Sequence, residues 1–174
     1  MAPVQLFTMS CPEFANTDSQ VFFDTVNLNL RSVFMASQAA VKHMAKYGGG
    51  SIINISSVGG LVPDISQIAY GTSKAAINYL TKLIAVQEAK HHIRCNAVLP
   101  GMTATEAVEK HLSADFRNLF MKHIPLSRMG LAEAVCYFAS DAAAYVTGQI
   151  LAASGGFGLA TPVYADIFNM QTKR

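Results

Sequence analysis

The sequence predicts an α/β fold in which helices cover both faces of a parallel sheet. Residues 51–57 form a β-branched run that is apolar on both faces, as strands of covered parallel sheets are. Segments with helical apolar spacing alternate with such strands along the chain. The 174 residues are 51% hydrophobic and 14% charged, which excludes a disordered chain. We expect one domain over residues 1–174, with an irregular start at 1–15 and a C-terminal tail at 157–174.

Charge and hydropathy exclude two classes of partner. The net charge is +2, and no basic cluster is longer than Lys173-Arg174, so we expect no nucleic-acid site. No run of eighteen apolar residues exists, so we expect no membrane span. Residues 1–8 are apolar but too short for a signal peptide and lack basic residues, which favours a cytoplasmic protein.

The cysteines are scattered along the chain and odd in number. Cys11, Cys95 and Cys136 have no metal-ligand spacing, and we expect no metal site. We interpret Cys95 and Cys136 as small core residues of a reduced protein.

The first helical pattern follows the irregular start. Thr17 and Gln20 have the spacing of a capping box, which predicts a short helix to about Val26. The pattern then continues over 27–46. Asn29 is unfavourable inside a helix because its amide competes with the backbone, so we expect a cap or a kink there.

The first strand and the longest helix come next. Glycines at 48–50 end the preceding helix, and 51–57 is the predicted strand. Because sites in open α/β sheets lie at the carboxyl ends of strands, Ser57 is a candidate site residue. A clean helical pattern covers 70–89, with an expected buried stripe of Ala76, Leu80, Leu83 and Ile84.

Tyr70 and Lys74 lie at i and i+4, on one face of this helix. A nearby ammonium favours a phenolate, so Lys74 is expected to lower the pKa of Tyr70 from its usual ~10 and suit it to proton transfer near neutral pH. The Ser57 hydroxyl could hydrogen-bond the same substrate oxygen and fix its place. A Tyr/Lys pair alone is more often a chance pair on a solvated helix face than a functional site.

Two further strands and one helix complete the pattern. Strands are expected at 93–99 and 150–154, with Asn96 as a structural hydrogen-bonding residue. Residues 106–124 form an amphipathic pattern with apolar positions Leu112, Phe116, Leu119 and Phe120. This segment is either a lid over a substrate or a plain core helix.

Several motifs in order resemble the short-chain dehydrogenase/reductase family. They are Asn29 in Asn-Leu-Arg-Ser-Val-Phe, Ser57, the Tyr70-Gly-Thr-Ser-Lys74 run and Pro100-Gly101, within a resemblance from about residue 16 to 156. The resemblance implies a Rossmann-like parallel sheet and a nicotinamide cofactor, NAD or NADP. It also implies hydride transfer with a secondary alcohol or ketone.

The resemblance assigns roles to individual positions. Tyr70 is implied as the general acid/base, Ser57 orients the substrate, and Lys74 holds the ribose. Asn29 is implied to support a water relay, which is compatible with a kink. The backbone after Pro100-Gly101 is implied to bind the nicotinamide amide, and the cofactor-binding positions extend to Thr103 and Thr105. An ordinary turn entering a helix is the alternative for this last stretch.

The chain also departs from the family pattern. None of its twelve glycines forms the glycine-rich turn between a strand and a helix that binds pyrophosphate. We therefore expect an incomplete fold, the C-terminal part of the family's sheet. The stretch 128–138 looks about four residues short, which predicts a shorter helix. The strand at 51–57 would then have an unpaired edge, which predicts marginal stability or dependence on oligomerisation.

The longest shared stretches point to a substrate class. Residues 55–70, 99–106 and 154–162 resemble bacterial bile-acid hydroxysteroid dehydrogenases acting at position 7 or 12. The expected partners are a steroid alcohol or ketone and further copies of the chain, as a dimer or tetramer in which the 70–89 helix packs on a neighbouring subunit. The alternatives are a 3-oxoacyl-(acyl-carrier) reductase and a truncated, non-catalytic remnant that acts as an assembly partner. The residue that selects NAD or NADP has no counterpart in the chain.

Overall fold

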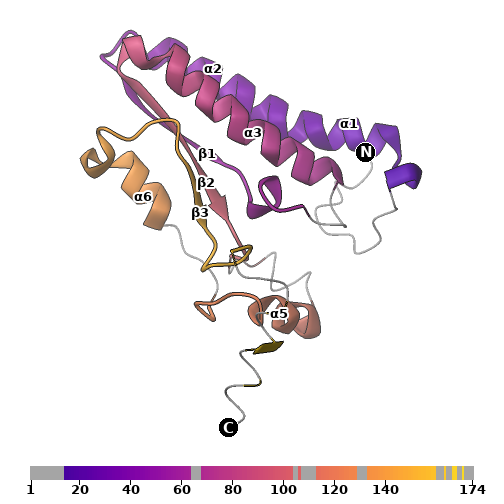
Figure 1. The fold of residues 1–174 in the computed structure, drawn as a ribbon. Coiled ribbons are helices and arrows are strands. Elements are labelled where there is room, and N and C mark those ends of the chain that lie inside the picture. Colours follow the sequence, from indigo (N-terminus) through magenta and orange to yellow (C-terminus); the bar gives the residue numbers. More distant parts are fainter. Residues whose placement is uncertain are drawn as a thin grey trace.

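A three-stranded parallel sheet lies at the centre of the computed structural model, which describes residues 14–63, 68–103, 106, 113–128, 133–159, 163, 166–167 and 170. Its order is β1 (Gly50–Ile55), β2 (Ile93–Pro100) and β3 (Ile150–Ala153). Ile52 pairs with Cys95, and Val98 pairs with Leu151. All three strands run in one direction, so their carboxyl ends share one edge (Figure 1). The predicted parallel α/β architecture is confirmed.

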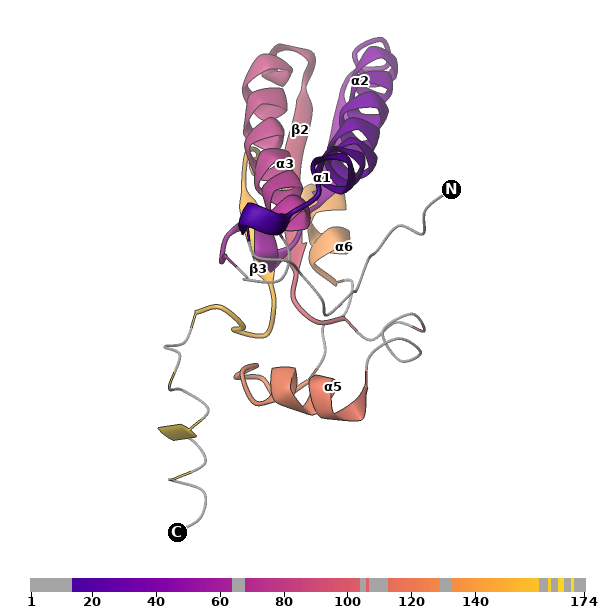
Figure 2. The same cartoon turned by 90° about the vertical axis from the view of Figure 1, so that its right-hand side faces the viewer.

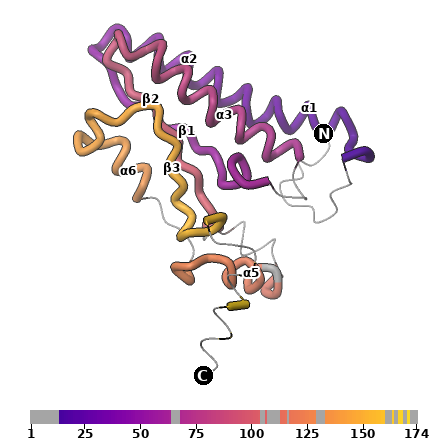
Figure 3. The backbone as a smooth tube through the Cα atoms, viewed as in Figure 1, coloured from indigo at the N-terminus to yellow at the C-terminus, as the bar shows by residue number. Residues whose placement is uncertain are grey.

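One long helical rod precedes the sheet. It consists of α1 (Ser19–Val26), a π-helical turn (Asn27–Arg31) and α2 (Ser32–Met44), which follow one another without a break (Figure 3). A short 3₁₀ turn, Phe14–Asn16, comes before it. The cap is Asp18, whose carboxylate accepts from the N–H groups of Gln20 and Val21, so the predicted start at Thr17 is wrong. A carboxylate at this position satisfies backbone donors that the helix leaves unpaired.

The rod and α3 (Ile68–Gln87) lie side by side on one face of the sheet (Figure 2). Ile52 of β1, Cys95 of β2 and Ala85 of α3 are buried together there, and Val41 and Met44 of α2 pack against them. Burial raises the pKa of the Cys95 thiol to about 12, as expected for a cysteine in an apolar core. A 3₁₀ turn, Ala89–His91, links α3 to β2.

The seven-residue α6 (Glu133–Ala139) covers the opposite face. Phe138 is buried against Val98, and its backbone carbonyl accepts hydrogen bonds from Arg94 Nη1 and Ser51 Oγ. A 3₁₀ turn, Asp141–Ala143, follows. Cys136 is exposed, so its predicted place in the core is wrong. The short helix turns Phe138 toward the sheet and leaves the Cys136 position facing outward.

The buried stripe of α3 differs from the expected one. Its buried residues are Ser73, Ile77, Asn78, Thr81 and Ala85. Leu83 is 41% exposed, and Ala76, Leu80 and Ile84 are half-buried. The expectation counted only apolar residues, whereas three of the five buried side chains are polar and hydrogen-bonded to other elements.

The predicted helix over 106–124 is interrupted. Ser113 is non-helical, and α5 runs only from Ala114 to Met121. Arg117 N–H donates to Ser113 O, and serine is a favoured residue for capping a helix start. Leu119 is 51% exposed, which disagrees with a plain core helix. Leu112 lies outside the described residues, and the role of this segment as a lid stays a prediction.

The described part of the sheet leaves one edge of β1 without a neighbour, because β1 pairs only with β2 there. Beyond β3, the tail is described at residues 157–159, 163, 166–167 and 170, and Phe157 packs against the core cluster of Val58 and Leu99. Among the described helices, none is long and apolar enough to cross a bilayer.

Candidate active site

Ser57 lies two residues beyond the end of β1, at the edge where the three strands finish. Its backbone is extended, with φ −162° and ψ 154°, and its side chain caps the 3₁₀ turn Val58–Gly60. The Oγ atom accepts a hydrogen bond of 3.1 Å from Gly59 N–H. A hydroxyl that accepts from the backbone keeps its own proton available, so Ser57 can donate to an oxygen placed beside it.

The Val58–Gly60 turn is docked directly on α3. Ser56 Oγ donates to Lys74 O at 3.0 Å, and Asn78 Nδ2 donates to Gly60 O at 3.2 Å. A Cβ atom on Gly60 would lie 2.7 Å from the carbonyl carbon of Lys74, so only glycine permits this approach. These contacts fix Ser57 relative to the helix that carries Tyr70 and Lys74.

Tyr70 and Lys74 lie one turn apart on α3 and are both half-buried. Lys74 Nζ lies 5.5 Å from the centroid of the Tyr70 ring and donates to Ile55 O at 3.0 Å. A Cβ atom on Gly59 would lie 3.6 Å from Ser57 Oγ and 3.9 Å from Tyr70 Cε1, so both side chains border the same point.

The charge of the Lys74 ammonium depends on how deeply its side chain is buried. Desolvation lowers the pKa of Lys74 from its ordinary value, because burial disfavours the charged form. The position of this ammonium beside a phenol and a backbone carbonyl suits it to hold a polar ligand. Among the described residues, no group of three His, Cys, Asp or Glu side chains is placed to hold a metal ion.

Asn29 lies in the π turn and reaches across to α3. Its Nδ2 donates to Ser73 Oγ at 3.0 Å, and Ser73 Oγ donates to Tyr70 O at 2.7 Å. The predicted irregularity at Asn29 is therefore present as a π turn, a feature that is frequent at functional sites. Sequence reasoning gave Ser73 no role, although a hydroxyl three residues after Tyr70 on the buried face was the available signal.

The predicted cofactor-binding positions after β2 are partly described. A Cβ atom on Gly101 would lie 3.0 Å from both Cα and Cβ of Ser154, so the end of β2 passes close to the end of β3. Thr103 is half-buried two residues later, and Thr105 lies outside the described residues. Lys74 and Tyr70 present an ammonium and a hydroxyl, a donor set that fits ribose hydroxyls. These two described groups therefore fit the ribose hydroxyls of a dinucleotide.

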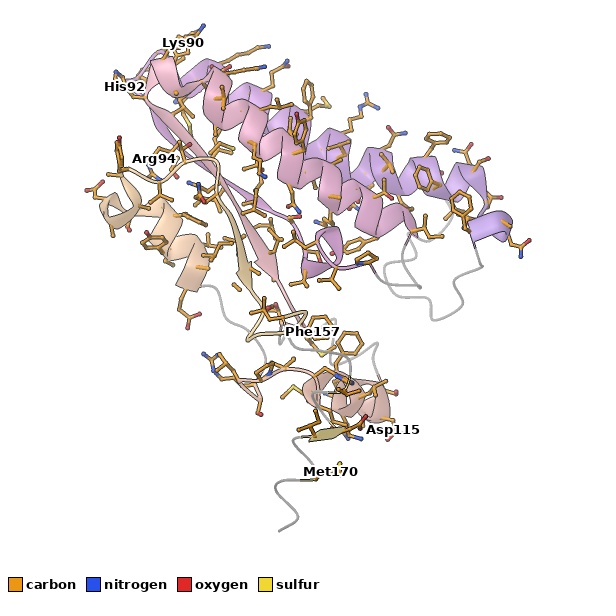
Figure 4. All side chains as sticks on the ribbon, in the orientation of Figure 1. Lys90, His92, Arg94, Asp115, Phe157 and Met170 are labelled. Carbon is orange, nitrogen blue, oxygen red and sulfur yellow. The ribbon has the colours of Figure 1, made fainter. Side chains whose placement is uncertain are left out.

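An apolar cluster packs beneath the turn that follows Ser57. Val58 is buried with Leu99, and Phe157 packs against this cluster. The Phe157 ring stacks on Phe120 with centroids 5.4 Å apart. Figure 4 shows Phe157 between the strand ends and α5. A Cβ atom on Gly158 would contact Val58 and Val62 at 3.3 Å and 3.0 Å. The strand ends thus have a polar side chain at Ser57 and an aromatic pair, Phe120 and Phe157, close to them.

Comparison with known proteins is consistent with this geometry. Residues 7–158 match the profile of a family described as Enoyl-(Acyl carrier protein) reductase. The chain is 50% identical over 153 residues to a 7alpha-hydroxysteroid dehydrogenase of Clostridium sardiniense, covering 86% of this chain and 58% of that protein. It is 40% identical over 135 residues to a 3-oxoacyl-[acyl-carrier-protein] reductase of Thermotoga maritima, covering 75% of this chain and 54% of that one.

A solved structure agrees in fold. A short-chain type dehydrogenase/reductase from Mycobacterium ulcerans superposes with a TM-score of 0.81 at 30% identity. The alignment covers 88% of this chain and 57% of that protein. The chain thus spans somewhat more than half the length of these relatives.

The docking of the Val58–Gly60 turn predicts unequal effects of two adjacent substitutions. Gly60→Ala forces a methyl group into the backbone at Lys74, and such overpacking should cost about 1–3 kcal/mol of unfolding free energy. Gly59→Ala meets its neighbours at ordinary contact distance and should change stability by less than about 0.5 kcal/mol. Urea denaturation of both variants measures the difference, and equal midpoints would contradict the docking.

Proposed function

The chain belongs to the short-chain dehydrogenase/reductase family, and from this membership we propose that it carries the proton-transfer site of an NAD(P)-dependent oxidoreductase acting on a secondary alcohol or ketone. The observation that supports the proposal most is the convergence of Ser57, Tyr70 and Lys74 at the carboxyl end of β1. Open α/β sheets bind ligands at this end of their strands.

Each side chain has a distinct part in the proposed reaction. During oxidation of an alcohol, Tyr70 takes the hydroxyl proton from the substrate, and during reduction it returns a proton to the ketone oxygen. Ser57 donates a hydrogen bond to the same oxygen and fixes its position. Lys74 holds ribose hydroxyls and places positive charge beside the phenol. A bound nicotinamide dinucleotide supplies the acceptor or donor of the hydride at the carbinol carbon.

Further positions hold the dinucleotide in this proposal. The backbone after Pro100-Gly101 binds the nicotinamide amide, with Thr103 and Thr105 beside it, and Asn29 supports a water relay from Lys74. The family resemblance supports these roles. Either NAD or NADP fits the described groups.

A cytoplasmic location suits the exposed thiol of Cys136, because thiols stay reduced there.

We propose a steroid, such as a bile acid, as the substrate, with the hydroxyl at position 7. The stacked rings of Phe120 and Phe157 near the strand ends suit a flat apolar molecule, because small-molecule sites combine apolar and aromatic side chains with a few polar groups. The identity to a relative named 7alpha-hydroxysteroid dehydrogenase supports the same position. A 3-oxoacyl-(acyl-carrier) reductase is the second candidate, which the matched family description and the Thermotoga maritima relative favour.

A substrate panel distinguishes these candidates. Nicotinamide reduction should be followed with 7-hydroxy and 12-hydroxy bile acids and with 3-hydroxyacyl carriers, using NAD and NADP in turn. The proposal expects turnover with the 7-hydroxy steroid, reduced at least ~100-fold by Tyr70→Phe, since a general acid/base contributes that much. Tyr145→Phe, a change at a fully exposed tyrosine, is the matched control and should leave turnover unchanged. Turnover of acyl carriers alone would exclude the steroid proposal.

Absence of turnover with every substrate would leave the non-catalytic alternative. Titration with NADH and NADPH, followed by fluorescence, then separates an inert chain from a binding one. No saturable binding of either dinucleotide would support an assembly partner without catalysis.

We also propose that the chain forms a homo-oligomer through the face shared by the rod and α3. A groove of about 430 Å³ lies there, lined mainly by apolar side chains that include Leu30, Phe34, Tyr79 and Leu83. Phe34 is 48% and Tyr79 66% exposed. Contiguous apolar surface of this kind marks interaction sites, and a second copy would present the same face to it.

Two substitutions on α3 test this interface. Leu83→Glu places a charge in the groove and should shift the oligomer toward monomer, because a buried unpaired charge is costly. Val86→Glu is the control, since Val86 is 79% exposed and does not line the groove. Analytical ultracentrifugation measures both. The interface proposal fails if the two variants have the same sedimentation behaviour as the unsubstituted chain.

A further inference from the structure

Ser73 is fully buried in the interior of α3, yet neither the apolar core nor the proposed chemistry uses it. Its hydroxyl makes two hydrogen bonds that link distant parts of the chain. It accepts from Asn29 Nδ2 at 3.0 Å and donates to Tyr70 O at 2.7 Å. The bond to Tyr70 O is the local bond to the preceding turn that helical serines often make, whereas the bond from Asn29 comes from another element of the chain.

The partner of Ser73 is held in an unusual backbone conformation. The π turn Asn27–Arg31 interrupts the α-helical hydrogen bonding of the rod. Ser32 Oγ donates to Leu28 O at 2.6 Å and to Asn29 O at 3.1 Å, which satisfies carbonyls at the turn. The backbone at Asn29 is therefore hydrogen-bonded within the rod, and its side-chain amide reaches across to α3.

The second hydrogen bond of Ser73 ends at the backbone of Tyr70. Tyr70 is the third residue of α3, and the first turn of a helix lacks part of its backbone hydrogen bonding and frays most readily. The Ser73 hydroxyl donates to the Tyr70 carbonyl and so ties the start of this turn to the buried Ser73 side chain. The Tyr70 backbone is thereby connected through one hydroxyl to the π turn of the neighbouring rod.

We propose that Ser73 is a positioning residue, whose hydroxyl couples the Asn29 π turn to the Tyr70 backbone and so holds the phenol in place beside Lys74 and Ser57. The inference rests on the proposed function of Tyr70 as the proton-transfer group. Loss of the hydroxyl leaves Tyr70 on a looser first turn, so the phenol spends less time in the productive geometry. Small misplacements of a reacting group lower the rate more than they weaken substrate binding.

The same helix offers a matched control two turns away. Thr81 Oγ1 accepts from Asn54 Nδ2 at 2.9 Å and donates to Ile77 O at 2.9 Å, the same asparagine–hydroxyl–carbonyl arrangement. Thr81 is also fully buried. Thr81→Val removes a comparable pair of bonds at nearly constant volume, without touching the turn that carries Tyr70.

The test compares Ser73→Ala and Thr81→Val for stability, kcat, KM and the pH dependence of kcat with the preferred substrate. Both variants should lose stability, whereas only Ser73→Ala should lower kcat, by ~10-fold or more with KM changed less than ~3-fold, and shift the pH profile. Asn29→Ala combined with Ser73→Ala should lower kcat by less than the product of the two single effects, since both changes interrupt the same hydrogen bond. Equal kcat and pH profiles for the Ser73 and Thr81 variants would overturn the proposal.

Hydrogen exchange gives a readout that needs no turnover. Ser73→Ala should speed amide exchange at residues 68–76 and at the π turn by ~10-fold or more, and Thr81→Val should not. If the unsubstituted chain turns over no substrate, the proposed function fails separately, and exchange alone decides the coupling. Unchanged exchange at residues 68–76 in Ser73→Ala would then overturn it.

Discussion

The close docking of the Val58–Gly60 turn on α3 is the constraint on which the site depends. It brings the end of β1 against the backbone of Lys74, with Gly60 as the residue that permits the approach. Ser56 and Asn78 hold the two elements together by hydrogen bonds. A strand-end hydroxyl and a helical tyrosine are thirteen residues apart in the chain, and this contact is what places Ser57 and Tyr70 beside a common point.

Buried amides determine how the helices sit on the sheet. Asn54 of β1 donates to Thr81 of α3 and accepts from Ser37 of α2, so one side chain connects three elements. Asn96 of β2 donates to Val146 O and accepts from Gln149 N–H, which fixes the approach to β3. Satisfied polar groups in a core favour one arrangement over others, because any shift leaves a buried group unpaired.

The sequence was sufficient for the features that depend on local pattern. The β-branched run at 51–57 predicted β1, although the strand ends at Ile55 and the serines continue into the turn. Asn96 has the structural role expected of it. The predicted buried face of α3 was wrong. Ser73, Asn78 and Thr81 are buried because they form hydrogen bonds to residues distant in the chain, and hydrophobic periodicity does not detect such bonds. The exposure of Cys136 likewise depends on tertiary packing.

The central claim is that a charged Lys74 beside Tyr70 supports proton transfer, and the pH–rate profile tests it most directly. Burial lowers the pKa of Lys74, so its ammonium loses its proton below the usual ~10.4 and the rate should fall on the alkaline side below that pH. In Lys74→Arg, the guanidinium stays charged to above pH ~12, and the alkaline fall should move upward. The same alkaline limb in both proteins would contradict the account.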